Sequence, residues 1–226
     1  MLFAEVLSRL ETLPSERPEG PAALMPSLVD GDGTRLRIRP DGPVPARRAA
    51  VLVLVHPGMD DEEAHVLLTE RVDRGGHHSG EVSFPGGRAE PADADPVATA
   101  LREAAEEVGL DPVAAGLRVV GSWPPLWIPV SDYAVTPILA VADRLPTLVA
   151  QPTEVARILS APVRLFLPGA DLLRVEREVR GMRLRYAAYP VDGLVVWGMT
   201  ARVLGSLGAV VAGEPREGSP VAQAGG

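Results

Sequence analysis

Apolar residues gather in short runs along the chain, separated by polar or glycine-rich segments. The run Ala49–Val55 is apolar throughout and has the length of a strand, which is typical of a strand buried on both faces of a sheet. Shorter apolar or alternating runs predict further strands at residues 65–71, 81–84, 117–121 and 138–141.

The first residues have helical periodicity. In residues 1–13, apolar side chains recur at Leu2, Val6, Leu10 and Leu13, so one side of the predicted helix is apolar. The segment from residue 14 to 45 is rich in proline and glycine and predicts an irregular connector, with a short strand at 35–38.

In the C-terminal third, apolar and polar residues alternate as in paired strands, and a helical pattern follows. Segments 174–179 and 183–190 flank Arg180-Gly181 and predict a hairpin. A helical turn is predicted at 162–167 and a last helix at 195–204. The pattern therefore divides the chain into an N-terminal helix and connector (1–45), a main domain (46–211) and a polar C-terminal tail (212–226).

The helix with the clearest ends begins after Asp95. Asp95 is a good N-cap, Pro96 suits the first helical position, and Gly109 can adopt the left-handed conformation that ends a helix. At helical spacing within it, one apolar stripe contains Val97, Leu101, Ala104 and Val108.

Three carboxylates lie on this helix, at Glu103, Glu106 and Glu107. Because they are three and four residues apart, they are predicted to project together from the side opposite the apolar stripe. They repel one another, and Arg102 offsets only part of that repulsion. A hard divalent cation would offset the rest, since Mg²⁺ and Mn²⁺ prefer carboxylate oxygen. The alternative is a solvated acidic helix face.

The segment before the helix favours the metal interpretation. Phe84-Pro85-Gly86-Gly87 ends an apolar run and brings two glycines beside the acidic helix, where they let the backbone approach a ligand closely. Together, loop and helix resemble the Nudix box, in which a glycine, a spacer and Arg-Glu-x-x-Glu-Glu-x-Gly bind metal and cleave diphosphates. The positions that match are Arg102, Glu103, Glu106, Glu107 and Gly109.

A second signature resembles the coenzyme A pyrophosphatase branch of that family. The pattern Leu-Leu-Thr-x-Arg-Ser-x3-Arg-x3-Gly-x-Val-x-Phe-Pro-Gly-Gly is matched by Leu67, Leu68, Thr69, Arg71, Gly80, Val82, Phe84, Pro85, Gly86 and Gly87.

The chain also departs from these patterns. Ala94 replaces a glutamate of the usual box, whose spacing is one residue longer here, and Asp93 or Asp95 is a candidate substitute. Val72 and Gly76 replace the serine and second arginine of the coenzyme A signature. An arginine near the pocket is a natural partner for a substrate phosphate, so these two replacements bear on which substrate the pocket takes.

The resemblance implies an α/β Nudix fold in which a mixed sheet is sandwiched between helices. It implies metal-dependent hydrolysis with Mg²⁺ or Mn²⁺ held by Gly87, Glu103, Glu106 and Glu107, and with Arg102 keeping the carboxylates in register. The substrate is expected to be coenzyme A or an acyl derivative. Open alternatives are ADP-ribose or a dinucleotide, and a Nudix-fold module that binds without turnover.

Other side chains are candidates with a structural alternative for each. Glu154 is a candidate fourth carboxylate or general base, or else a partner of the loop backbone. His78 could orient phosphates or pack within its loop. Tyr133 belongs to a loop that could offer stacking surface or plug the core. The other predicted substrate contacts are Arg71, Arg74 and Phe84.

The amino-acid composition limits the classes of molecule that this protein is expected to bind. The chain has 226 residues, is 46% hydrophobic and carries a net charge of −8, which argues against an extended nucleic-acid surface. No cysteine is present, so disulfides and thiolate chemistry are excluded. No apolar run approaches the roughly 20 residues needed to span a bilayer. We therefore expect a cytoplasmic protein with a small-molecule partner and no membrane partner, and a homodimer is left open.

Overall fold

The structure is a computed structural model that describes residues 1–28, 47–59, 62–73, 80–128, 131–179 and 182–213. The predicted strand at 35–38, the candidates Arg74 and His78, and nearly all of the predicted tail lie outside these ranges. Among the described helices, none is both long and apolar enough to cross a membrane.

In the described residues the strands form two sheets. The eight-stranded sheet has the core order β4-β3-β2-β8-β6, with β5, β7 and β9 pairing to β2, β8 and β3. Only β2 and β8 run parallel, so the sheet is mixed as expected. Its strands are β2 (Arg47–Pro57), β3 (Ala64–Arg71), β4 (Val82–Ser83), β5 (Gly86–Arg88), β6 (Leu117–Ser122), β7 (Leu126–Ile128), β8 (Tyr133–Ala142) and β9 (Val155–Pro162).

The central strand β2 is buried on both faces, as its unbroken apolar run predicts. Alternate residues of a strand point to opposite faces. Val51, Val53 and Val55 therefore join one hydrophobic cluster, and Ala50, Leu52 and Leu54 join the other.

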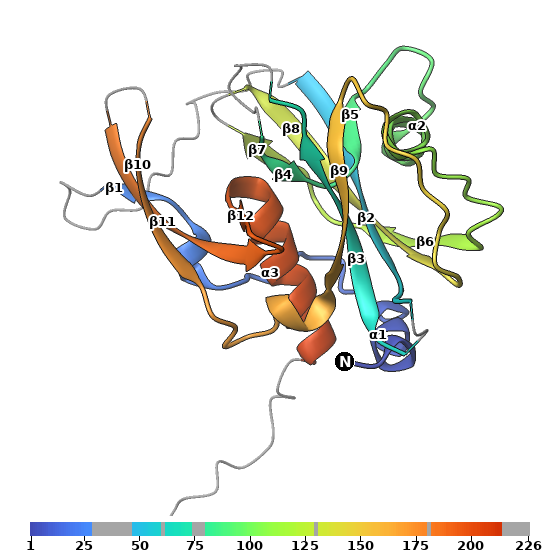
Figure 1. The fold of residues 1–226 in the computed structure, drawn as a ribbon, viewed down its shortest axis with the longest axis horizontal. Coiled ribbons are helices and arrows are strands. Elements are labelled where there is room, and N and C mark those ends of the chain that lie inside the picture. Colours follow the sequence, from blue (N-terminus) through green and yellow to red (C-terminus); the bar gives the residue numbers. More distant parts are fainter. Residues whose placement is uncertain (29–46, 60–61, 74–79, 129–130, 180–181, 214–226) are drawn as a thin grey trace, which may run out of the picture.

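Helix α2 (Pro96–Val108) covers the second of these faces (Figure 1). The Asp95 side chain accepts a 2.8 Å hydrogen bond from Ala98 N, and Gly109 ends the helix in the left-handed region at φ 63°. Both predicted ends are confirmed. Ala100, Ala104 and Val108 are buried against β2.

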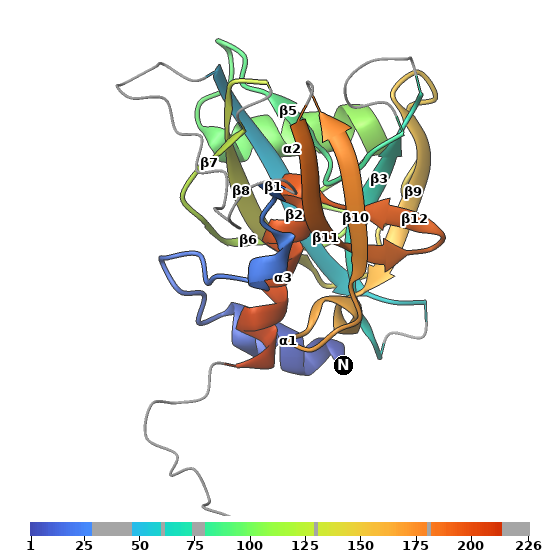
Figure 2. The same ribbon diagram turned by 90° about the vertical axis from the view of Figure 1, so that its left-hand side faces the viewer.

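The opposite face is covered by helices α1 (Phe3–Leu10) and α3 (Gly198–Ala212) and by the second sheet, which faces the viewer in Figure 2. That sheet contains the predicted hairpin, β10 (Leu173–Val179) with β11 (Met182–Val191), and also β1 (Ser27–Leu28) and β12 (Leu194–Val196). Short 3-10 helices lie at Ala22–Leu24 and Val163–Phe166. The described fold is therefore the expected sandwich with an added small sheet.

The predicted start of the last helix was wrong. Residues 194–196 pair with β11, and α3 begins at Gly198. The cause is a tight turn at Asp192-Gly193, where both residues have positive φ (51° and 80°). An Asp-Gly pair favours this hairpin turn, and it places the apolar residues that follow in a strand.

Candidate active site

The two glycines of β5 are required by close approach of their neighbours. β5 pairs with β2, opposite Ala50 and Val51. A Cβ on Gly86 would lie 2.4 Å from the Ala50 carbonyl oxygen, and one on Gly87 would lie 2.6 Å from the Glu103 carboxylate. The missing side chains therefore let Glu103 of α2 sit directly against the backbone of β5.

Glu107 is the most buried of the helix carboxylates, with 4% of its side chain exposed. Gly86 N donates a 3.1 Å hydrogen bond to its Oε2, and Arg71 Nη1 lies 3.6 Å from its Oε1. Desolvation raises the pKa of Glu107 to about 7; the Gly86 bond and Arg71 oppose this rise, while Glu103 and Glu154 add to it. The carboxylate is thus held in place with its charge only partly compensated.

Glu103 lies on the same helix as Glu107, and its carboxyl group also has a raised pKa. Burial is the main cause that raises the pKa of Glu103, and the charges of Glu106 and Glu154 add to the shift. Arg102 opposes the shift through a 3.1 Å hydrogen bond from its Nη2 to Glu103 Oε1. Two desolvated carboxylates therefore face the glycine loop together.

The prediction places all three carboxylates on the side opposite the apolar stripe; in the structure they differ in exposure. Glu106 is 59% exposed, whereas Glu107 lies next to Val108 at the edge of the buried stripe. Burying a carboxylate needs compensation, which here comes from the Gly86 amide and from Arg71.

The Arg102 guanidinium donates hydrogen bonds to five oxygens on four residues. Its Nε and Nη2 donate to the two carboxylate oxygens of Asp93 at 3.0 and 3.1 Å, its Nη1 donates to Glu106 at 3.1 Å, and its Nη2 also reaches Glu103 and the Arg88 carbonyl. The Arg102 guanidinium holds the pKa of Asp93 well below its usual range. These contacts fit the predicted role of keeping carboxylates in register.

The Asp93 carboxylate is engaged elsewhere as well. It accepts hydrogen bonds from Thr99 Oγ1 at 2.9 Å and from Glu90 N at 2.8 Å. Asp95 caps the helix. Neither of these aspartates joins the pair Glu103 and Glu107 in the described contacts; Asp93 instead anchors the arginine beside that pair.

A cleft of about 390 Å³ opens beside the glycine loop. Its lining includes Arg71 and Tyr133, which are predicted substrate contacts, and Gly87, which is a predicted metal ligand. Tyr133 stacks under Arg47, whose guanidinium carbon lies 4.6 Å from the ring centre. The tyrosine therefore has one ring face toward a cation while it contributes to the cleft wall.

The cleft also contains residues that sequence reasoning missed. Trp197 and Met199 line its far wall from the start of α3, and Trp197 stacks on Tyr186 with ring centres 5.1 Å apart. Their position depends on the unforeseen Asp192-Gly193 turn. The signal that could have revealed them is the sequence Trp197-Gly198, which follows the hairpin directly and marks the start of the helix.

Phe84 was expected to contact substrate, and the structure places it elsewhere. Its side chain is 1% exposed and belongs to the hydrophobic core below the loop, outside the cleft lining. Phe84 follows β4, and the residues shortly after it pair with β2, so its side chain is buried beneath the loop. Its contribution is to pack the loop in position.

The two alternatives for Glu154 are a carboxylate near the acidic residues and a partner of the loop backbone, and the structure has features of both. Its backbone N donates to the Gln151 carbonyl at 2.9 Å, and its carbonyl accepts from Val72 N at 3.0 Å. Its exposed carboxylate raises the pKa of both Glu103 and Glu107. The residue therefore ties its loop to β3 and adds a negative charge near the pair.

The donor set suits a divalent cation. Among the residues that the structure describes, no three acidic or histidine side chains already form a closed cage. The pair Glu103 and Glu107 has uncompensated negative charge beside the Gly87 backbone. Mg²⁺ typically takes one or two carboxylates and completes its shell with water and substrate phosphate, so an open pair is the fitting arrangement.

Known proteins resemble this chain in sequence and in fold. A family model described as "NUDIX domain" matches residues 46–157. The chain is 37% identical over 164 residues to "Nudix hydrolase 15, mitochondrial" of Arabidopsis thaliana, covering 70% of this chain and 56% of that protein. It is 36% identical over 160 residues to "Uncharacterized Nudix hydrolase NudL" of Yersinia pestis (strain Pestoides F), covering 70% and 76%. The chain thus spans little more than half of the plant relative.

Among solved structures, the fold is similar to the Nudix hydrolase RenU from M. Smegmatis. That match has 25% sequence identity and a TM-score of 0.44, and covers 53% of this chain and 73% of the other. A MutT/nudix family protein from Enterococcus faecalis matches with 15% identity and a TM-score of 0.47, covering 75% and 62%.

Proposed function

The chain belongs to the Nudix hydrolase family, and from this premise we propose that it hydrolyses the diphosphate of a nucleoside diphosphate derivative in a metal-dependent reaction. One observation carries the proposal above all others. The desolvated carboxylates of Glu103 and Glu107 lie together against the Gly86-Gly87 loop, at the edge of a cleft large enough for part of a nucleotide.

In this proposal Glu103 and Glu107 hold the metal, with Glu106 and the Gly87 carbonyl as further donors. Bound Mg²⁺ or Mn²⁺ would supply Lewis acidity toward the phosphate oxygens and lower the pKa of water. Arg102, fixed by Asp93, keeps Glu103 and Glu106 in register. The general base is proposed to be Glu154, whose carboxylate is exposed and whose charge reaches the acidic pair.

Arg71 is proposed to contact the substrate phosphates. It lines the cleft, and its 3.6 Å contact with Glu107 leaves its guanidinium partly exposed. Its planar donors suit phosphate oxygens, and a phosphate would replace part of the Glu107 contact when metal neutralises that carboxylate.

We propose coenzyme A or an acyl derivative as the substrate, giving adenosine 3′,5′-bisphosphate and 4′-phosphopantetheine or its acyl form. The support is the matched signature before the box and a cleft wall formed by Ile128, Trp197 and Met199, which suits a long, weakly polar arm. The replacements Val72 and Gly76 favour a second candidate substrate, ADP-ribose or a dinucleotide.

Product analysis with Mg²⁺ or Mn²⁺ on a panel of diphosphates tests the proposal. Coenzyme A, dephospho-coenzyme A, ADP-ribose and a dinucleotide are compared by kcat/KM. Preference for coenzyme A over its dephospho form supports recognition of the 3′-phosphate. Preference for ADP-ribose or the dinucleotide moves the assignment to the second candidate. Binding of these compounds without any turnover would leave a non-catalytic binding module.

A further inference from the structure

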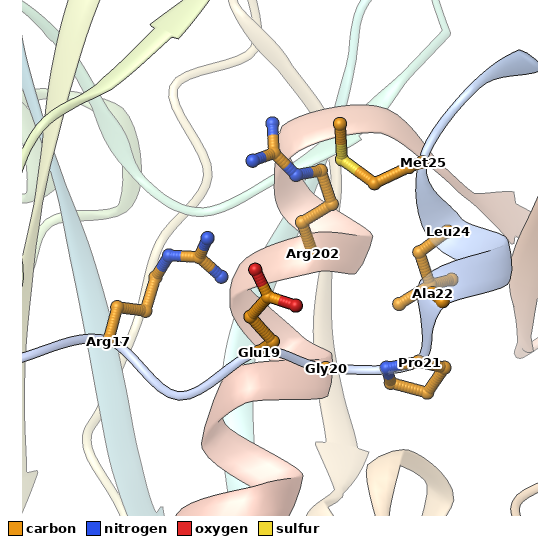
Figure 3. A pocket seen from close by; sticks show the side chains of 8 residues that line it. All are labelled: Arg17, Glu19, Gly20, Pro21, Ala22, Leu24, Met25 and Arg202. Carbon is orange, nitrogen blue, oxygen red and sulfur yellow. The ribbon is translucent and has the colours of Figure 1, made fainter. Parts of the chain in front are cut away.

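A second pocket lies between the segment 17–25 and helix α3 (Figure 3). It has a volume of about 230 Å³, and its walls come from the N-terminal segment and one residue of α3, Arg202. The pocket is separate from the active-site cleft, because the two share no lining residue. Nothing in the proposed hydrolysis uses it.

Glycines fix the position of this pocket. A Cβ on Gly20 would lie 2.8 Å from the Gly205 backbone, and one on Gly205 would lie 2.9 Å from Pro21. The extended segment therefore crosses α3 in direct backbone contact. This crossing holds Arg17 and Arg202 on the two sides of one opening.

The two arginines point toward the same space in Figure 3, with the Glu19 carboxylate between them. Arg17 is anchored, since its Nη1 donates to Ser206 Oγ at 2.5 Å and to the Pro18 carbonyl at 3.5 Å. Within the described residues, the Arg202 guanidinium donates no hydrogen bond to the protein. One cation is thus fixed and the other still has its donors available.

The charge balance of the pocket is positive. Burial lowers the pKa of both arginines, and the charge of Arg17 lowers the pKa of Arg202 further. Glu19 acts in the opposite direction on both. One carboxylate for two guanidinium groups leaves one positive charge that a bound anion would compensate.

We propose that this pocket is a binding site for the phosphate group of a small phosphomonoester. Two guanidinium groups from different elements offer donors around a tetrahedral oxyanion. The pocket is larger than phosphate alone, and Pro21, Leu24 and Met25 complete its wall. These side chains give the organic part of the ester an apolar surface.

Calorimetric titration of the full chain with a metal chelator present tests this site without turnover. The probes are n-butyl phosphate, inorganic phosphate and butyrate. We expect n-butyl phosphate to bind most tightly, inorganic phosphate next and butyrate weakest. Equal binding of butyrate and n-butyl phosphate would overturn the assignment to phosphate, and no binding of either phosphate would overturn the site.

Variants locate the binding. Arg202→Gln should weaken n-butyl phosphate binding at least about tenfold, because it removes a charge-assisted donor. Glu19→Gln should tighten it a few-fold, because it removes the competing carboxylate. Damage to the fold would weaken binding in both variants, so the opposite signs identify an electrostatic effect, and Tm values check folding.

Two further variants separate this site from the active-site cleft. Arg71→Gln changes the cleft, and Arg144→Gln changes an exposed arginine bound to the Ala114 carbonyl. Arg144→Gln should bind n-butyl phosphate like the unchanged protein. Arg71→Gln, which removes a proposed phosphate contact of the cleft, should lose less binding than Arg202→Gln. Loss of binding in Arg71→Gln with retention in Arg202→Gln would place the ester in the cleft and overturn the inference, whatever the outcome of the hydrolysis assays.

Discussion

At the scale of single residues, the site is defined by an imbalance of charge. Glu107 is almost fully buried, yet its compensation is one backbone N–H and one arginine at 3.6 Å. A carboxylate in such surroundings costs free energy in the metal-free protein. The cost is understandable if the carboxylate exists to bind a cation.

Replacing Glu107 with glutamine should separate activity from stability. Glu107→Gln keeps an oxygen for the Gly86 N–H and removes the desolvated charge. We expect kcat to fall at least about a hundredfold, the scale of losing one electrostatic stabiliser, while the metal-free Tm stays equal or rises. Steady-state kinetics and thermal unfolding measure the two effects.

Glu106→Gln is the matched control, because Glu106 is on the same helical turn and is exposed. It should lose less activity than Glu107→Gln. Near-normal kcat in Glu107→Gln would remove this residue from the reaction.

Stability should also depend on pH through the same side chain. The folded-state pKa of Glu107 is about 7 against an ordinary value of 4.5. Its contribution to the free energy of unfolding is therefore complete below about 4.5 and is lost as pH rises through 7. We expect the metal-free Tm to decrease between pH 5 and pH 8.

Thermal unfolding at both pH values, with Glu107→Gln in parallel, measures this effect. The variant should show a smaller decrease, and Mg²⁺ should restore Tm at pH 8 in the unchanged protein. An equal decrease in the variant would assign the pH dependence to other groups.

At the scale of elements, α2 and β5 act as one unit. Asp95 and Gly109 fix the ends of α2. Arg102, which belongs to α2, binds Asp93 and so connects the helix to the segment that precedes it. The helix therefore presents Glu103 at a defined distance from Gly87. Arg102 orients Glu103 and Glu106 through direct hydrogen bonds to their carboxylates.

Asp93→Asn tests this orienting role. The amide keeps the shape of the side chain and loses the charge that binds Arg102. We expect kcat to fall about tenfold, the lower end for losing a partner that orients metal ligands. Tm should fall as well, because the Asp93 side chain is only 7% exposed and both of its oxygens accept hydrogen bonds. The metal concentration for half-maximal activity should rise.

Asp95→Asn is the matched control for this change. Asparagine caps helices as well as aspartate does, so Asp95→Asn should retain activity. Equal losses in the two variants would indicate a general disturbance of the segment before α2 rather than a role of Asp93.

Sequence reasoning reached the elements whose signals are local. The strand at Ala49–Val55 and the helix between Asp95 and Gly109 follow from periodicity and capping. The metal site proposed on that helix came from the resemblance of loop and helix to the Nudix box. The burial of Glu107 and Phe84 could not be foreseen, because it depends on how β5 pairs with β2. The cleft wall at Trp197 required the turn at Asp192-Gly193, which shifts the start of the last helix.

At the scale of the whole molecule, α3 joins the two sheets. It belongs to the same hydrophobic cluster as β2 and β11, and its first turn forms part of the cleft. It approaches the 3-10 helix Val163–Phe166 so closely that a Cβ on Gly208 would lie 1.8 Å from the Phe166 carbonyl oxygen. The position of the cleft wall therefore depends on packing far from the acidic box.

Gly208→Ala has an expected effect opposite to helix propensity. In an exposed helix, replacing glycine with alanine stabilises by about 1 kcal/mol. Here the added methyl group meets the Phe166 carbonyl, and we expect a loss of at least about 1–3 kcal/mol, as for overpacked cores. Chemical denaturation measures the difference.

The converse change on a neighbouring, partly exposed position provides the comparison. Ala209→Gly should cost no more than about 1 kcal/mol, the propensity effect alone. A stabilised Gly208→Ala variant would mean that α3 can move away from Val163–Phe166 without penalty.

The contact between Gly87 and Glu103 has a consequence for anyone who wants to change the specificity of the proposed hydrolase. In a library of variants randomised at the Gly86-Gly87 loop, most sequences would carry a side chain at position 87, and that side chain would displace Glu103. Diversity is better directed to the opposite wall, at Ile128, Trp197 and Met199, where new shapes can be selected without disturbing the acidic pair.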